Sequence, residues 1–167
     1  MRRGFSLIEV VVYLAILALL ITSAVRLVLA SSFNVAAVRA ERKIMADGGF
    51  AMQAMIREIR LSSGTGAGSV FGTRPGPLAL TTLLGPGEST ETTKTFSRAG
   101  ARLVRQAPSS PSEFLTSSDA RVTNLTFWRS ANAKSDLIRI KLTLEAGQGR
   151  SLESATFYGA AVFRRKY

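Results

Sequence analysis

Glu9 is the residue whose chemistry stands out first, because its carboxylate lies near the start of an otherwise uncharged apolar run, FSLIEVVVYLAILALLITSAV. A charged group at the centre of a bilayer costs about 2.5–3.5 kcal/mol even on the insertion scales that give the smallest penalties. A neighbouring cation offsets this cost, whereas an unpaired carboxylate bears it in full. The sequence therefore predicts a cationic partner for Glu9.

The chain contains few residues of the types that usually catalyse reactions or bind metals. The 167-residue chain contains no cysteine and no histidine, which removes most pairs of nucleophile and general base and the usual transition-metal ligands. It has neither a Ser-x-x-Lys spacing nor a Gly-rich loop followed by Lys-Ser or Lys-Thr. Asp119, Asp136 and Glu113 stand apart, and without an Asp-x-Asp loop they do not predict a calcium site. We expect a protein that is not an enzyme, with no catalytic residue, cofactor or metal.

The chain is strongly basic, with 22 Lys and Arg against 11 Asp and Glu and a formal net charge of +11. Most of the basic residues occur singly or in pairs, as they do on a solvated surface. The densest group is Arg164, Arg165 and Lys166. These three residues are candidates for contact with a polyanion such as acidic lipid or nucleic acid, and a solvated basic tail is the alternative.

Residues 5–25 are long enough to cross a membrane. As a helix they would measure about 31 Å, against a hydrocarbon core of roughly 30 Å. Arg2 and Arg3 precede the run, so the positive-inside bias predicts a cytoplasmic amino terminus, a single crossing and a domain outside. A cleaved secretory signal is one alternative, but its apolar region usually has about 7–15 residues and ends at a small-x-small site. A plain uncleaved anchor is another, and it leaves Glu9 unpaired in lipid.

The stretch from Arg3 to Val10, RGFSLIEV, resembles the class III signal of type IV pilins and type II secretion pseudopilins. That signal combines basic residues, a glycine, a phenylalanine and a glutamate fifth after the glycine, at the start of an apolar helix. The resemblance implies that prepilin peptidase cleaves between Gly4 and Phe5, that the new amino group of Phe5 is methylated, and that the hydrophobic segment is retained. It also implies location in the inner membrane, with the domain periplasmic or extracellular, and then in a pilus or pseudopilus.

The resemblance also implies a partner for Glu9. Cleavage would leave an ammonium group on Phe5, and in a helical filament this group of one subunit can meet Glu9 of another. The pair is satisfied only in the correct register, since any other register leaves a buried ion unpaired. Phe5 and Glu9 are thus the predicted assembly residues; in the alternative, Glu9 snorkels to the interface or is protonated. The implied partners are prepilin peptidase, other pilin or pseudopilin subunits, the inner-membrane assembly platform and the lipid bilayer.

The helix is predicted to continue well beyond the apolar run. The first proline is Pro75, so nothing in the covalent structure prevents a helix from Phe5 to about Leu61. The pair Gly48-Gly49 either admits close packing or marks a bend. Apolar residues in the second half recur at three- and four-residue steps and should form the floor of a core; they are Ile44, Met45, Met52, Met55, Ile56 and Ile59.

Strands dominate the rest of the chain. Turn-forming residues at 62–68 should end the helix, and the segment APSSP at 107–111 should break the chain again. Ile138 and Ile140 alternate with Arg139 and Lys141, which predicts a strand with one buried and one solvated face. Strands are predicted at 78–83, 92–97, 101–106, 121–128, 137–144 and 155–163, the second and third forming a hairpin across 98–100.

The predicted fold class is α+β and pilin-like: a long amino-terminal helix, membrane-spanning in its first half and amphipathic in its second, packed on a small antiparallel β-sheet. The expected organisation is a prepilin leader at 1–4, a transmembrane and assembly helix at 5–25, its amphipathic continuation at 26–62 and a β-sheet domain at 63–167. The segments IREIR, LVR and VTNLTF resemble those of J-type minor pseudopilins and minor pilins. The lack of a cysteine pair and of a proline in the outer half of the membrane segment also favours a minor component.

Two functions follow for testing. The first is a minor pilin or pseudopilin, assembled from the inner membrane into a type IV pilus or a type II secretion pseudopilus. The alternative is a DNA-binding minor pilin of a DNA-uptake system, which would use Arg139 and Lys141 together with the basic group at 164–166. Aromatic residues near basic ones are Trp128 beside Arg129 and Tyr167 beside Lys166.

Overall fold

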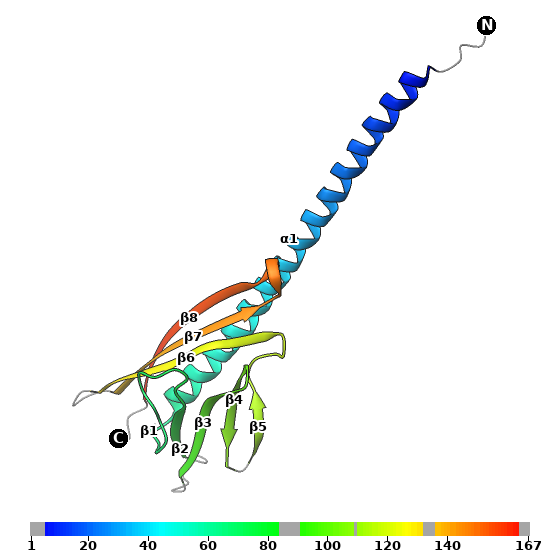
Figure 1. The fold of residues 1–167 in the computed structure, drawn as a ribbon. Coiled ribbons are helices and arrows are strands. Elements are labelled where there is room, and N and C mark those ends of the chain that lie inside the picture. The colour runs from blue at the N-terminus through cyan, green and yellow to red at the C-terminus, as the bar shows by residue number, and fades with distance from the viewer. Residues whose placement is uncertain (1–5, 84–90, 109, 132–135, 164–167) are drawn as a thin grey trace.

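The computed structural model describes residues 6–83, 91–108, 110–131 and 136–163. One long helix, α1 (Leu7–Leu61), projects from a globular half that is built from its own carboxyl-terminal part and two antiparallel sheets (Figure 1). The strands are β1 (Gly64–Thr65), β2 (Leu78–Leu83), β3 (Glu91–Ala99), β4 (Arg102–Ala107), β5 (Ser110–Phe114), β6 (Ala120–Ala131), β7 (Asp136–Ala146) and β8 (Glu153–Val162), with a short 3-10 turn η1 (Gly149–Ser151) before β8. The predicted α+β, pilin-like class is confirmed.

Helix α1 is continuous over 55 residues, a length of about 82 Å at 1.5 Å per residue. It ends where predicted, because Ser62 is extended and its backbone N–H donates to the Ile59 carbonyl at 3.2 Å. The helix passes through Gly48 and Gly49 without interruption. A Cβ atom on Gly48 would lie 2.3 Å from the ring of Phe157 on β8. Close packing is therefore the role of this glycine, and the bend is excluded.

The predicted apolar stripe is confirmed for Ile44, Met52, Met55 and Ile59, which are buried, and Ile56 packs against them while partly buried. The prediction is wrong for Met45, which is 51% exposed although Ala40 and Ile44, nearer the amino terminus, are buried. At about 100° per residue, Met45 lies at the edge of the stripe whose middle holds Ile44 and Met55. Periodicity identifies the side of a helix that is buried but does not fix the width of the buried stripe.

The strands form two sheets where one was expected. Strands β1 to β5 pair in chain order, and β6 to β8 form a second meander whose β7 and β8 lie against α1 (Figure 1). Strand β2 matches its predicted range, and the predicted β3–β4 hairpin is present. The strand β5 was missed, since the break predicted at 107–111 includes its first residues. All five of its residues are exposed, so no alternation marks it, and a proline is compatible with an edge strand.

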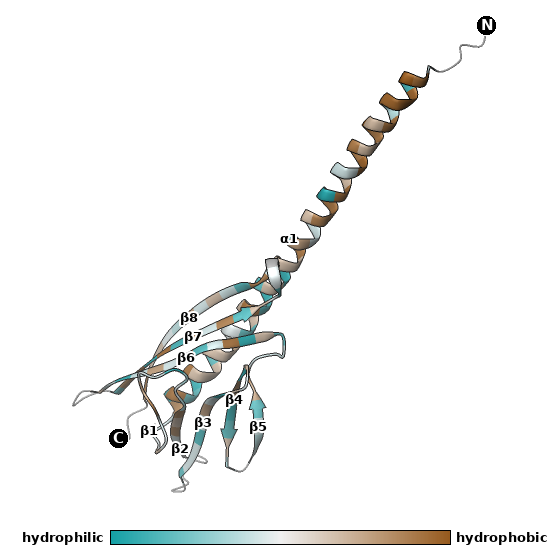
Figure 2. Cartoon of the chain, viewed as in Figure 1, coloured by the Kyte–Doolittle hydropathy of each residue, from teal (hydrophilic) through white to brown (hydrophobic). Residues whose placement is uncertain are grey.

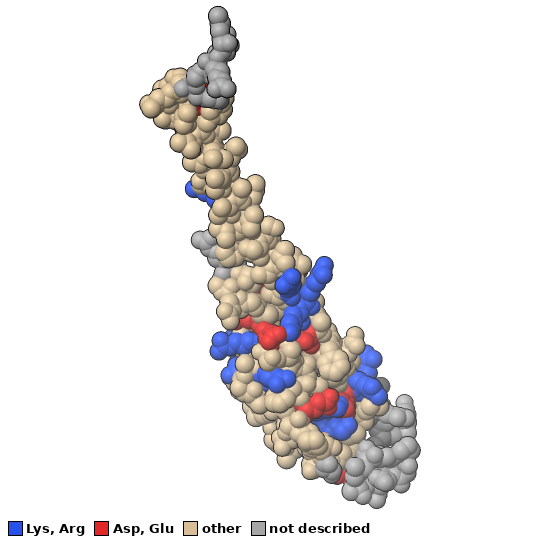
Figure 3. Space-filling view, turned by 90° about the vertical axis from the view of Figure 1, so that its right-hand side faces the viewer, with Lys and Arg blue, Asp and Glu red and all other residues tan. Residues whose placement is uncertain are grey.

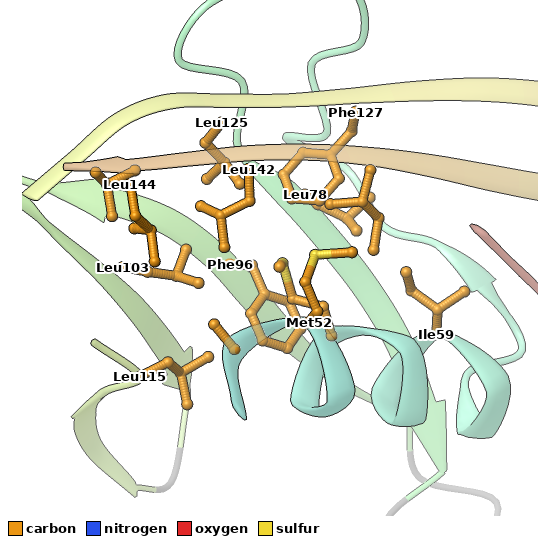
Figure 4. Packing of buried hydrophobic residues seen from close by; sticks show 14 of the residues in the cluster. Met52, Ile59, Leu78, Phe96, Leu103, Leu115, Leu125, Phe127, Leu142 and Leu144 are labelled. Carbon is orange, nitrogen blue, oxygen red and sulfur yellow. The ribbon is translucent and has the colours of Figure 1, made fainter. Parts of the chain in front are cut away.

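The core lies between α1, the inner face of β6 to β8 and the strands β2 to β4 (Figure 4). The alternation predicted for β7 is confirmed, because Ile138 and Ile140 are fully buried while Arg139 is exposed. Phe96 and Phe127 fill the space between the two sheets and the helix. The sheets thus cover one side of the second half of α1, whereas the residues of its first half are exposed.

Candidate functional site

The projecting half of α1 is mostly hydrophobic in Figure 2. From Leu7 to Val38, each large apolar residue is at least 45% exposed. A helix that is apolar all round is stable when lipid or other protein surrounds it. Figure 3 shows one face of the molecule, on which charged groups of both signs gather over the globular half, whereas the projecting helix carries few of them. By length and composition, α1 is a candidate membrane-spanning helix.

Glu9 lies in the first turn of this helix. The Ser6 carbonyl accepts the backbone N–H groups of Glu9 at 3.0 Å and of Val10 at 3.3 Å, which starts the helical hydrogen bonds. An acidic side chain near a helix amino terminus is favoured by the helix dipole. The next charged residue along α1 is Arg26, 17 positions later and therefore about 26 Å away. Within the described residues, no cation of the same chain can reach Glu9.

The exposed apolar surface is longer than one bilayer. The segment from Leu7 to Val38 measures about 48 Å at 1.5 Å per residue, whereas a hydrocarbon core is roughly 30 Å thick. Beyond Arg26, large side chains such as Leu27 and Phe33 remain exposed, at 72% and 45%. The hydrocarbon core can therefore cover only part of this surface at one time.

Several predicted site residues lie outside the described part of the chain. They are the cleavage and methylation residues Gly4 and Phe5 and the basic group Arg164, Arg165 and Lys166.

The structure does bring Arg139 and Lys141 together on the outer face of β7 with Trp128 of β6 and Tyr158 of β8. Sequence reasoning did not single out Tyr158. The sequence feature that could have identified it is the alternation in β8, where Phe157 faces the helix and Tyr158 faces solvent.

The carboxylates that were considered for calcium each form an ion pair. Asp119 bonds to Lys43 of α1, Asp136 to Arg129 and Glu113 to Arg105. The hydrogen bond to Asp119 raises the pKa of Lys43, and the same contact lowers the pKa of Asp119. The hydrogen bond to Asp136 likewise raises the pKa of Arg129. These pairs join elements of the globular half.

Sequence reasoning also missed Glu58. Its side chain lies in the apolar stripe of α1, three residues after Met55, and is buried. Lys94 of β3 and Arg105 of β4 each bond to one of its oxygens at 2.9 Å. The three-residue spacing from Met55 is the sequence feature that could have predicted a buried position for this carboxylate.

Comparison with known proteins places these features in a class. Residues 1–25 match the family model for the prokaryotic N-terminal methylation motif. Neither a curated protein nor a solved structure matches the chain. The motif is the class III prepilin signal, and it supports membership of the type IV pilin and pseudopilin family. The long helix packed on antiparallel sheets agrees with that assignment. The matched residues 1–25 overlap the start of α1, the candidate membrane-spanning helix.

Proposed function

We propose that the protein is a minor pilin or pseudopilin, cut by prepilin peptidase between Gly4 and Phe5 and assembled into a type IV pilus or a type II secretion pseudopilus. Before assembly it crosses the inner membrane once, with its amino terminus in the cytoplasm and its globular half outside. The inner-membrane assembly platform then transfers it into the filament.

The observation that carries this proposal is the mismatch between the exposed apolar helix and the bilayer. About 48 Å of apolar surface cannot all be covered by a core of roughly 30 Å, so a subunit confined to the membrane leaves side chains such as Leu27 and Phe33 in water. Packing α1 against the same helix of neighbouring subunits covers the whole length. A filament is therefore the state in which this surface is stable.

Glu9 sets the position of one subunit relative to the next. Its carboxylate has no cation within reach in the described residues of its own chain. After cleavage, the amine of Phe5 on a neighbouring subunit supplies one. Because a buried carboxylate without a partner is strongly destabilising, helices in any other register are disfavoured. The mechanism is assembly, with no chemical turnover by the subunit itself.

Processing and packing can each be tested directly. Mass spectrometry of the protein from its own cells should find a chain that starts at Phe5 and carries one methyl group. A chain that retains Met1 would contradict the proposal. Because the sequence has no cysteine, the single variant Leu29→Cys can form one disulfide per subunit, and on oxidation it should give a cross-linked dimer wherever two such subunits are neighbours in the filament. The same cysteine in a Gly4→Val background is the control, since an uncleaved subunit stays in the membrane and should give no dimer.

A further inference from the structure

The outer face of the three-stranded sheet carries an arrangement that the proposed packing between α1 helices does not involve. On β8, Phe157 and Gly159 pack against α1, so the alternate residues Tyr158 and Ala160 point away from the helix. The antiparallel register sets Trp128 opposite Arg139 and Lys141 opposite Tyr158. Two aromatic and two basic side chains from three strands therefore share one face.

Three of these residues, Trp128, Arg139 and Tyr158, line a shallow depression of about 700 Å³, and Lys141 lies beside Tyr158. The small residues Gly159 and Ala160 form part of its lining, with Trp128 on one flank and Tyr158 on the other. Tyr158 is 72% exposed and Trp128 is 39% exposed. The Cα atoms of the two residues lie two strands apart and two residues apart along the strands, which corresponds to about 12 Å. Two aromatic residues at that backbone separation offer two platforms for two flat groups.

The charge on this face is positive. Arg139 lies between the two aromatic positions, and the Lys141 ammonium is 5.7 Å from the centre of the Tyr158 ring. Neither basic residue forms a salt bridge with another described residue. The acid on the same face of β7, Glu145, is opposite Arg121 in the register. The two cations near the depression are therefore available to an anionic ligand.

We propose that this face binds single-stranded nucleic acid, with bases stacked on Trp128 and Tyr158 and phosphates bound by Arg139 and Lys141. Stacking platforms beside a track of positive charge are what sequence-tolerant single-strand binding requires. Duplex DNA fits less well, because its bases are already stacked on one another and cannot cover the two rings. An acidic protein would use the two cations and leave the exposed ring of Tyr158 without a role. The site lies away from α1, so it is independent of assembly through that helix.

The test uses the full chain in detergent micelles, with fluorescence anisotropy of a labelled oligothymidylate of about 12 nucleotides, within the usual range of site sizes. A duplex of the same length is the competing ligand. We expect tighter binding to the single strand. Tyr158→Ala should weaken it by about 5- to 150-fold, the range expected for the loss of one stacked base, and Tyr158→Phe, which keeps the ring, should stay close to the wild type.

The phosphate contacts are tested through salt dependence. For single strands the slope of log affinity against log salt is about −0.7 per phosphate contact, so the double variant Arg139→Ala/Lys141→Ala should flatten it by about 1.4. The matched control is Arg57→Ala/Arg60→Ala, which removes the same charge from exposed positions on α1 and should leave the slope unchanged. Circular dichroism checks that each variant is folded.

Three results would overturn the proposal: equal affinity for single strand and duplex, no loss on Tyr158→Ala, or an equal change of slope in the control pair. Each would mean that the scattered positive charge of the chain, and not this face, attracts the ligand. Displacement of the oligonucleotide by an acidic protein that binds equally well to Tyr158→Ala would instead assign the face to a protein partner, and would also refute the proposal.

Discussion

The buried carboxylate of Glu58 on α1 accepts a hydrogen bond of 2.9 Å from the guanidinium of Arg105 on β4. Its second oxygen accepts one of the same length from Lys94 on β3. Only 8% of the Glu58 side chain is exposed, against 32% and 27% for the two cations. One acid on the helix therefore fixes the position of two strands of the five-stranded sheet, and each oxygen has its own cation.

The pairing predicts a non-additive loss of stability. Lys94→Ala or Arg105→Ala alone leaves Glu58 with one cation, so each should cost about 1–2 kcal/mol, as for other lost charged hydrogen bonds. The double variant leaves the buried carboxylate unpaired and should cost more than the sum, with a contribution of about 3–5 kcal/mol from that charge. Chemical denaturation in detergent measures the free energies of unfolding. Glu113→Ala, at the exposed pair with Arg105, is the control and should cost about 0–1 kcal/mol. Strict additivity would show that the two cations act separately.

Adjacent glycines in α1 should respond to alanine with opposite signs. A Cβ on Gly48 would lie 2.3 Å from the Phe157 ring, whereas a Cβ on Gly49 would meet nothing within 4 Å. Gly49→Ala should therefore raise the free energy of unfolding by about 1 kcal/mol, through helix propensity. Gly48→Ala gains the same propensity but displaces the ring, and since overpacking costs about 1–3 kcal/mol, the net effect should be a loss. Thermal denaturation of the two variants checks this. Equal stabilisation by both would mean that Phe157 moves aside freely.

Local patterns in the sequence predicted much of this fold, and contacts between distant segments account for most of what was missed. The alternation around Ile138 and Ile140 identifies β7 because one face of that strand is buried and the other is wet. The uniformly exposed β5 has no such pattern. The partners of Glu58 come from 36 and 47 residues away, a distance over which periodicity says nothing. Likewise, the sequence alone identified Arg129 as the basic neighbour of Trp128, but the register of β6 and β7 sets Trp128 opposite Arg139.

The contact of Lys43 with Asp119 predicts a defined dependence of stability on pH. The hydrogen bond from Lys43 lowers the pKa of Asp119 below its ordinary 3.8, so this carboxylate stabilises the folded state above about pH 4 and loses that effect as pH falls through its folded pKa. The pKa of Lys43 is raised above 10.5, so its contribution is full below that pH and is lost as pH rises through the folded value. The melting temperature of Lys43→Gln should therefore differ from that of the wild type at pH 7.

The control for this contact is Arg42→Gln, which removes the same charge from the neighbouring exposed position. The difference between the wild type and Lys43→Gln should shrink as the buffer is taken below pH 4, because Asp119 then takes up a proton. A difference that stays constant down to pH 2, or one that Arg42→Gln reproduces, would assign the effect to overall charge.

The proposed role of Glu9 predicts that its loss separates membrane insertion from assembly. In Glu9→Leu the apolar run is uninterrupted, so insertion should be unchanged or improved, since an unpaired charge in lipid is costly. The neighbouring subunit then buries its Phe5 ammonium without a partner, a penalty of about 3–5 kcal/mol, which corresponds to a fall in incorporation on the order of 100-fold or more. Cell fractionation followed by filament shearing measures both quantities, with Glu41→Leu, an exposed acid on the same helix, as the matched control. If Glu9→Leu entered filaments as well as that control, the register of the subunits would have to come from apolar packing alone, and the carboxylate would serve another purpose.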